Sequence, residues 1–231
     1  MKLGNEETLQ RIKGGLIVSC QALPEEPLHS SFIMGRMALA ASQAGAVGIR
    51  ANTVADIKEI RNMVGLPIIG IIKKVYDDCP DVYITPTIAE VDALTACGVE
   101  IIATDATRRD RPGGETIETF FSKVRAKFPD QLFMADCSNV EEGMEAAALG
   151  FDLIGTTMAS YTPYTRGCPL PPFDMIEYLV KNCGRPVVAE GNIITPEHLR
   201  HAMDLGVLTA VVGSAITRPL EITKRFVAVL K

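Results

Sequence analysis

Two charged residues end short apolar stretches of the 231-residue chain: Lys73 ends PIIGIIK and Glu190 ends PVVAE. A lysine at the edge of an apolar environment loses solvation, which lowers its pKa and makes a neutral amine available. Such an amine can take a proton from carbon or form a Schiff base, and a nearby carboxylate can hold the ammonium or exchange a proton itself. We expect Lys73 and Glu190 to be catalytic. The plainer alternatives are a surface lysine and a structural ion pair between the two.

Polar residues also end other apolar stretches, and their types suit the binding of a small hydroxylated substrate. Arginine offers a fork of hydrogen-bond donors, and aspartate offers two acceptor oxygens. The alternative for Arg50 and Asp136 is a salt bridge between them. The expected substrate-binding residues are Gln21, Arg50, Asp105, Asp136 and Thr156.

Two glycine-containing segments near the C-terminus predict an anion site. Glycines let backbone N–H groups approach a phosphate, a following helix N-terminus adds a favourable dipole, and an arginine can neutralise the remaining charge. The alternative is a purely structural turn. The expected phosphate-binding residues are Gly191, Asn192, Gly213, Ser214 and Arg218.

These candidates belong to a regular alternation of strand-like and helix-like stretches. Most of the strand-like stretches are short apolar runs, which is typical of parallel strands covered on both faces. The expected strands are 15–21, 47–50, 67–73, 101–105, 132–136, 153–156, 186–190 and 210–213. The expected helices are 32–44, 54–63, 88–96, 116–128, 140–148, 174–182, 196–205 and 220–230.

An internal repeat indicates how these units are arranged. A helix end followed by a glycine and an apolar strand recurs about every 50 residues, at Gly45, Gly98, Gly150 and Gly206. Each glycine suits the left-handed position after a helix. Two units per repeat give eight, so we predict an α/β fold of the (β/α)₈ TIM-barrel type. We expect one domain over residues 1–231 with a short N-terminal helix; an open doubly wound sheet is the alternative. In such barrels the reacting groups lie at the carboxyl ends of the strands.

Composition limits the classes of partner. The chain is 47% hydrophobic and 22% charged, with a net charge of −5. There is no basic surplus for nucleic acid or a membrane surface. The longest apolar run, 66–72, is too short to span a bilayer, and the polar first residues lack the apolar region of a secretory signal. We expect a cytoplasmic protein, and the apolar content is compatible with a homodimer.

The cysteine and histidine patterns predict no metal site. None of the six cysteines is spaced as C-x-x-C, and Cys20 and Cys137 lie in apolar stretches that suggest small buried side chains. His198 and His201 lie on an expected outer helix, and His29 follows the first strand, where it could reach a substrate. We therefore expect neither a catalytic metal nor an organic cofactor.

Ten segments resemble the bacterial N-acetylmannosamine-6-phosphate 2-epimerases, and together they span the chain from residue 15 onward. They are GLIVSCQALP (15–24), PLHSSFIM (27–34), GIRA (48–51), GIIK (70–73), TDAT (104–107), MAD (134–136), GTT (155–157), YTPY (161–164), AEG (189–191) and VGSAITRP (212–219). One departure is Ser214, where the family pattern has a second glycine; serine keeps the backbone N–H that phosphate binding needs.

The resemblance implies a cofactor-independent isomerase of sialic acid and amino-sugar catabolism, which interconverts N-acetylmannosamine 6-phosphate and N-acetylglucosamine 6-phosphate. It also implies that Lys73 moves the proton, with Glu190 close by and Gln21, Arg50 and Asp136 holding the sugar. Inversion at C2 requires loss of the proton α to the aldehyde of the ring-opened sugar, and Arg50 could stabilise the developing oxyanion. Either Glu190 or a substrate hydroxyl could return the proton.

Two other functions fit the same residues. A Schiff-base phosphosugar aldolase would also use a strand-end lysine and a phosphate site, and borohydride would trap its adduct on Lys73. A non-catalytic phosphosugar-binding protein would bind its ligand without exchanging the proton on C2.

Overall fold

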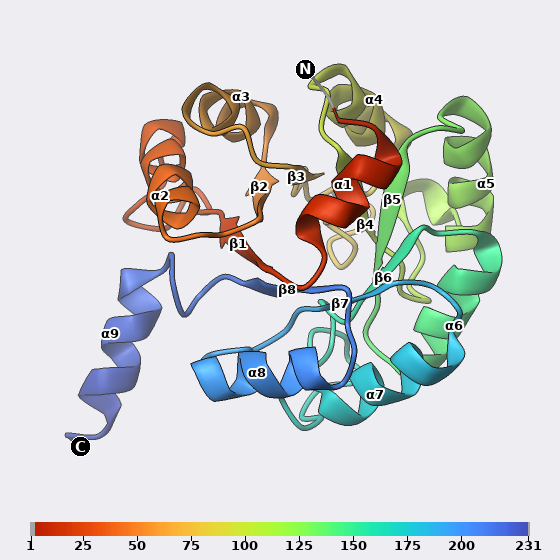
Figure 1. The fold of residues 1–231 in the computed structure, drawn as a ribbon. Coiled ribbons are helices and arrows are strands. Elements are labelled where there is room, and N and C mark those ends of the chain that lie inside the picture. Colours follow the sequence, from red (N-terminus) through yellow and green to blue (C-terminus); the bar gives the residue numbers. More distant parts are fainter. Residues whose placement is uncertain (1–2, 231) are drawn as a thin grey trace.

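The computed structural model describes residues 3–230 and contains a closed barrel of parallel strands (Figure 1). The strands follow one another around the ring in chain order, and β1 pairs with β8 to close it. They are β1 (Leu16–Cys20), β2 (Gly48–Asn52), β3 (Ile68–Ile71), β4 (Ile101–Asp105), β5 (Leu132–Asp136), β6 (Leu153–Gly155), β7 (Val187–Ala189) and β8 (Thr209–Val212). This confirms the predicted (β/α)₈ barrel.

Helices connect successive strands around the outside of the ring (Figure 1). They are α2 (Ser31–Gln43), α3 (Val54–Met63), α4 (Ile88–Ala96), α5 (Ile117–Lys127), α6 (Val140–Leu149), α7 (Phe173–Asn182) and α8 (Pro196–Asp204), followed after β8 by α9 (Pro219–Ala228). A short 3₁₀ turn, η1 (Pro112–Gly114), lies between β4 and α5, and the expected N-terminal helix is α1 (Asn5–Ile12). No helix in the described residues is long and apolar enough to cross a membrane.

Local signals in the sequence explain where these elements begin and end. The four repeat glycines Gly45, Gly98, Gly150 and Gly206 have φ values of 95°, 69°, 96° and 93°, the left-handed conformation predicted for them. Side chains that accept hydrogen bonds from the first turn cap several helices; Thr87 and Glu90 form a reciprocal capping box at α4. These caps satisfy backbone N–H groups at the starts of α3, α4, α5, α6 and α8.

Apolar side chains form two layers. One fills the barrel, with Ile69, Met134 and Val211 among its members, and the other lies between the strands and the outer helices. Ile12 of α1 is fully buried and belongs to the inner layer, so α1 covers the amino-terminal end of the barrel. The carboxyl ends of the strands form the open mouth.

The ends of β2 and β3 differ from the sequence prediction, and both differences bear on the site. Strand β2 continues to Asn52, so Arg50 lies within the strand instead of ending it. Strand β3 ends at Ile71, because the next residues pair in antiparallel fashion with a returning segment: Lys73 bridges Ile84. Lys73 is therefore held above the barrel by this local pairing.

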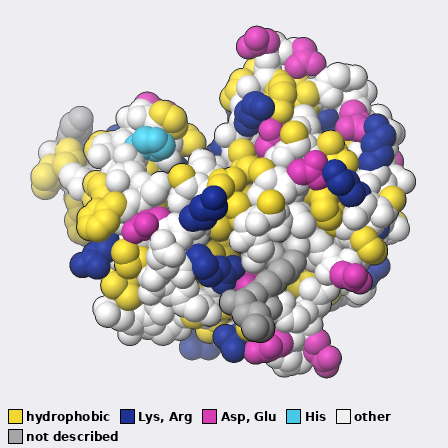
Figure 2. All heavy atoms as spheres, turned by 90° about the horizontal axis from the view of Figure 1, so that it is seen from above, with side chains coloured by type: hydrophobic (Ala, Val, Ile, Leu, Met, Phe, Trp, Pro, Cys, Tyr) yellow, Lys and Arg dark blue, Asp and Glu magenta, His cyan; other side chains and the backbone are white. Residues whose placement is uncertain are grey.

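Helix α9 differs from every other α-helix in the described residues, because none of its residues is buried. It projects away from the barrel at the C-terminal end of the chain (Figure 1). Its exposed apolar side chains include Leu220 and Phe226, at 45% and 73% exposure. Figure 2 shows hydrophobic side chains gathered at this edge of the molecule.

Candidate active site

A cavity of about 760 Å³ opens at the mouth of the barrel. Its lining comes from the segments that follow β1, β3, β6, β7 and β8. Of the residues predicted from the sequence, eight line it: Lys73, Glu190, Gln21, Gly191, Asn192, Gly213, Ser214 and Arg218. The other four, Arg50, Asp105, Asp136 and Thr156, are at most 1% exposed and lie outside the lining.

Lys73 reaches the cavity from the segment just after β3. Its backbone N–H donates to Asn52 Oδ1 at 2.8 Å, and Ile84 is its partner across the antiparallel bridge. The amine has no hydrogen bond or ion pair with any described residue. Burial lowers the pKa of Lys73 to about 8; the positive charges of Arg50 and Arg218 add to this effect, whereas Glu190 and Glu26 oppose it. Near neutral pH an appreciable fraction of the amine is therefore uncharged.

Glu190 follows β7 and belongs to a cluster of buried charged groups. Arg50 donates to Glu190 Oε2 at 2.9 Å and to both oxygens of Asp136, at 3.1 and 2.6 Å. The Thr157 hydroxyl lies 2.6 Å from Asp136 Oδ1 and 3.2 Å from Glu190 Oε2. Burial raises the pKa of Glu190 to about 7, and the negative charge of Asp136 adds to this, while Arg50, Thr157 and Lys73 oppose it.

The salt bridge between Arg50 and Asp136, the alternative considered for these two residues, is present in the structure. Both side chains are almost completely buried. One guanidinium thus holds two carboxylates, and only Glu190 of the three groups lines the cavity. The arrangement fixes the position of Glu190 and leaves its carboxylate next to the mouth.

Thr156 and Asp105 are engaged elsewhere. The Thr156 hydroxyl donates to the Glu190 carbonyl at 2.7 Å and accepts from the Glu190 N–H at 3.1 Å. Asp105 accepts from the Thr107 N–H and hydroxyl and forms an ion pair with Arg109 at 2.7 Å. The structure therefore brings neither side chain to the cavity: Thr156 fastens the Glu190 backbone, and Asp105 organises the loop after β4.

Gln21 is largely buried at the end of β1. Its Nε2 donates to Ser19 Oγ at 2.8 Å, and its Oε1 is buried without a hydrogen-bond partner in the described residues. A buried acceptor left unpaired costs free energy. It lies in the cavity lining, where a hydroxyl of a ligand could pair with it.

The predicted phosphate-binding residues lie together in one part of the cavity. Gly191 has φ +118°, and an added Cβ would lie 3.2 Å from the Thr156 carbonyl oxygen. The backbone N–H groups of Gly191, Asn192 and Ser214 have no acceptor among residues 3–230. Arg218 is also present, paired with Glu26 at 2.9 Å. Free N–H donors beside a guanidinium are the groups that bind a phosphate.

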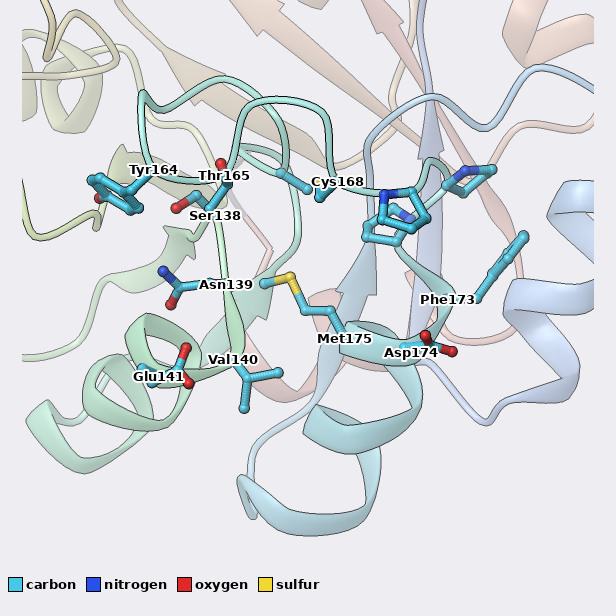
Figure 3. A pocket seen from close by; sticks show the side chains of 14 residues that line it. Ser138, Asn139, Val140, Glu141, Tyr164, Thr165, Cys168, Phe173, Asp174 and Met175 are labelled. Atoms are coloured by element: carbon cyan, nitrogen blue, oxygen red, sulfur yellow. The ribbon is translucent and has the colours of Figure 1, made fainter.

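A second cavity, of about 440 Å³, lies behind the loop that joins β6 to α7 (Figure 3). Ser138 and Asn139 of the turn before α6, Tyr164 of the loop and Phe173 of α7 are among its walls. Its described lining contains no lysine, arginine or histidine, so it lacks the charge that a phosphate needs. We assign the candidate site to the larger cavity.

Thr157 and Asn52 are among the polar residues of the site that the sequence did not predict. Thr157 was passed over for Thr156, because the strand was expected to continue one residue further than Gly155. Two adjacent threonines at a strand end are the signal that could have kept both as candidates. Asn52 was missed because β2 was expected to stop at Arg50; spacing of two residues on one strand places both on the same face.

The cysteine prediction is confirmed for Cys20 and Cys137, which are fully buried and free. Burial raises the pKa of both thiols. His29 is exposed, with Nδ1 3.1 Å from the Ala22 carbonyl oxygen, and does not line the cavity. Among residues 3–230, no three His, Cys, Asp or Glu side chains lie close enough together to hold a metal ion.

Comparison with known proteins agrees with this geometry. A curated relative from Clostridium perfringens strain 13, a putative N-acetylmannosamine-6-phosphate 2-epimerase, is 56% identical over 223 residues, covering 96% of this chain and all of the relative. A relative of the same description from Lactiplantibacillus plantarum is 52% identical over 224 residues, covering 96% and 98%.

The solved structure of the N-acetylmannosamine-6-phosphate 2-epimerase from Clostridium perfringens matches with a TM-score of 0.91 at 55% identity, covering 96% of this chain and 95% of that one. The model of the family described as putative N-acetylmannosamine-6-phosphate epimerase matches residues 34–231. This chain therefore belongs to the N-acetylmannosamine-6-phosphate epimerase family.

Proposed function

We propose that this protein is an isomerase that interconverts N-acetylmannosamine 6-phosphate and N-acetylglucosamine 6-phosphate, a step of sialic acid and N-acetylmannosamine catabolism. The observation that carries the proposal is the amine of Lys73, unpaired in the cavity with its pKa lowered to about 8. The close relatives named for this activity agree with it. The remaining residues of the mouth are assigned roles by their contacts.

Lys73 acts as the base that removes the proton from C2. In the ring-opened sugar this proton is α to the C1 aldehyde, so its loss gives an enolate. The lone pair of Nζ takes the proton, the electrons of the C2–H bond form a C1–C2 double bond, and the C1 oxygen becomes negatively charged. A general base works best when its pKa lies near the operating pH, as that of Lys73 does.

Epimerisation then needs a proton delivered to the opposite face of C2. Strands β3 and β7 lie four positions apart in the ring of eight, so Lys73 and Glu190 approach the mouth from opposite sides. Glu190, with a pKa near 7, holds a proton in part of the molecules at neutral pH. We assign the return of the proton to Glu190; a hydroxyl of the sugar is the competing donor.

The other predicted residues support these two. Arg50 and Asp136 position Glu190 through their hydrogen bonds, and Thr156 fixes its backbone. Arg50 also places positive charge beneath the mouth, which favours the enolate. Gln21 offers its free Oε1 to a sugar hydroxyl.

The C6 phosphate lies against the loops after β7 and β8. Gly191, Asn192, Gly213 and Ser214 supply backbone around it, and Arg218 supplies charge once it shares or leaves Glu26. Asp105 holds the loop after β4, away from the phosphate. None of these roles requires a metal or an organic cofactor.

The test is to incubate the protein with N-acetylmannosamine 6-phosphate in deuterated water and to follow C2 by proton NMR. We expect product with deuterium at C2 from the unmodified chain and none from Lys73→Ala. Bound substrate without exchange would contradict the proposal and favour a phosphosugar-binding protein. Borohydride trapping of an adduct on Lys73 would favour the aldolase.

The role of Glu190 is tested with Glu190→Gln and each epimer supplied separately in deuterated water. If Glu190 serves one face, this variant exchanges the C2 proton of only one epimer and forms no product. Epimerisation at the rate of the unmodified chain would contradict the assignment and identify a substrate hydroxyl as the donor.

We further propose that the protein acts as a cytoplasmic homodimer in which a second copy covers α9. A ten-residue helix is marginal on its own, and this one exposes Leu220, Phe226 and Val227. The free thiols and the phosphorylated substrate support a cytoplasmic location. Sedimentation velocity should give a dimer that Phe226→Asp dissociates, while Tyr178→Asp on the exposed face of α7 leaves it intact. A monomeric unmodified chain would contradict the dimer.

A further inference from the structure

The two ends of the mouth differ in chemistry. The end beside β7 and β8 carries backbone N–H groups and Arg218. The end beside β3 and β6 is lined by four largely apolar side chains, which we call the apolar wall: Tyr83, Ile84, Met158 and Tyr161. None of them takes part in the proton transfer or the phosphate contacts described above.

Backbone pairing places Ile84 directly beside Lys73. The Lys74 N–H donates to the Tyr83 carbonyl at 2.9 Å, and the Thr85 N–H donates to the Ile72 carbonyl at 2.8 Å. Side chains of directly opposed residues in an antiparallel pair lie on the same face, with Cβ atoms about 4.5–5.5 Å apart. The apolar wall therefore begins next to the stem of the catalytic amine.

The apolar wall has a buried part, which we call its floor, formed by Ile84 and Met158, and an exposed edge formed by Tyr161. Ile84 and Met158 are only 3% and 1% exposed and belong to the apolar cluster that fills the barrel. Tyr83 packs against the same cluster, and Tyr161 is 67% exposed at the rim. The Tyr161 N–H donates to the Met158 carbonyl at 2.9 Å, so one tight turn carries both floor and edge.

The two tyrosines add hydroxyl groups to this apolar surface. The hydroxyl of Tyr83 has no hydrogen-bond partner among residues 3–230, and the residue lies near Tyr161 and the Asp105–Arg109 pair. A tyrosine hydroxyl can donate to a carbonyl oxygen. An apolar surface with a free hydroxyl donor suits a small acyl group on an amide.

The direction of the substrate follows from the two functional ends. If the phosphate on C6 lies beside β7 and β8 and C2 lies at Lys73, the nitrogen on C2 is on the side away from the phosphate. This step depends on the proposed function. Ile84, the neighbour of Lys73, is then the first side chain that the N-acyl group meets.

We propose that Tyr83, Ile84, Met158 and Tyr161 form the subsite for the N-acyl group and determine which acyl groups the enzyme accepts. The acyl carbon chain packs on Ile84 and Met158, and the Tyr83 hydroxyl donates to the amide carbonyl. A free ammonium on C2 would leave that hydroxyl unpaired and bring charge to an apolar surface. The subsite therefore selects acylated over free hexosamine 6-phosphates.

The wall also predicts how acyl length is limited. Two adjacent residues line different cavities: Ala159 lines the second cavity, and Met158 lines the mouth. Shortening Met158 opens space into which a longer acyl chain can extend, whereas removing Tyr161 opens the pocket to solvent.

The test measures kcat and KM with mannosamine 6-phosphate and its N-acetyl, N-propanoyl and N-butanoyl derivatives. The unmodified chain should prefer the N-acetyl substrate. Met158→Ala should raise the N-butanoyl to N-acetyl ratio of kcat/KM about tenfold, as expected when an apolar pocket changes by a methylene or more. Tyr83→Phe should raise KM for the acylated substrates about fivefold, the loss of one hydrogen bond, without affecting the free amine.

Tyr161→Ala provides a variant whose exposed position does not threaten folding, and Tyr178→Ala on α7 is the matched control. Tyr161→Ala should weaken the preference for acylated substrates, and the control should leave every ratio unchanged. Ratios that do not move in any wall variant would overturn the subsite while the epimerase function stands. If the unmodified chain epimerises none of the four sugars, the proposed function itself fails.

Discussion

Two clusters at the mouth of the barrel contain the same three residue types: an arginine, an aspartate and a threonine. Their aspartates lie on neighbouring strands, but the two clusters have different roles. One is Arg50, Asp136 and Thr157, and the other is Arg109, Asp105 and Thr107. The two aspartates are register partners between β4 and β5 and are both fully buried. By sequence position alone they are equivalent.

The source of the arginine separates them. Arg50 comes from β2, three positions from β5 in the ring, and its guanidinium also holds Glu190, which follows β7. Arg109 comes from four residues after Asp105, so that cluster closes on its own loop. A long-range arginine connects a strand-end aspartate to the reacting groups, whereas a local arginine leaves it structural.

Replacing each arginine by methionine should give the largest difference in activity between the two clusters. Arg50→Met leaves two buried carboxylates without their cation and releases Glu190, so we expect kcat/KM to fall about a thousandfold. Both variants should lower the free energy of unfolding by about 3–5 kcal/mol, in Arg109→Met because Asp105 loses its ion-pair partner. The activity of Arg109→Met per folded molecule should stay close to that of the unmodified chain. Steady-state kinetics and urea unfolding separate the two effects, and Arg50→Lys covers the case in which Arg50→Met does not fold.

Replacing each aspartate by asparagine should give a smaller difference, which is visible in the pH dependence of kcat/KM. If Lys73 must be neutral and Glu190 protonated, kcat/KM has its optimum between their pKa values, about 7 and about 8. The negative charge of Asp136 raises the pKa of Glu190, so Asp136→Asn lowers that pKa and moves the optimum to lower pH. Asp105→Asn should leave the optimum in place. An optimum that moves equally in both variants would remove the distinction between the clusters.

The threonines offer the finest comparison. Thr157→Val removes one hydroxyl shared by Asp136 and Glu190, and we expect kcat to fall about tenfold, the equivalent of one hydrogen bond to charged groups. Thr107→Val removes a hydroxyl that donates to Asp105 and accepts from Arg109 within the local cluster, so it should change melting temperature more than kcat. Calorimetry and initial rates on the two variants check this, and equal losses of kcat would contradict it.

The sequence predicted the secondary-structure elements and their order well, because these follow from the pattern of apolar residues and glycines. Apolar runs and repeat glycines identified all eight strands, and strand ends identified Lys73 and Glu190. The destinations of individual side chains depend on where a strand stops. Strand β6 ends one residue earlier than predicted, and for this reason Thr156 was predicted to bind substrate and Thr157 was not. The antiparallel segment that carries Ile84 was not predicted from the sequence.

The exposed position of α9 could not be predicted from the sequence pattern either. The pattern predicted a helix over 220–230 in the last βα unit, and the structure leaves its apolar side chains exposed. A helix that packs against another copy has the same periodicity as one that packs within its own chain. The sequence therefore predicts the helix but not what its apolar face contacts.

The most direct test of the account is the titration of Lys73 itself. In protein labelled with ¹³C at lysine Cε, the Lys73 signal is the one missing from Lys73→Arg, and its chemical shift reports the charge on Nζ. We predict a midpoint near pH 8, well below the ordinary lysine value of 10.5. A midpoint at the ordinary value would mean that the amine is charged at neutral pH, and it would contradict the role of Lys73 as the base.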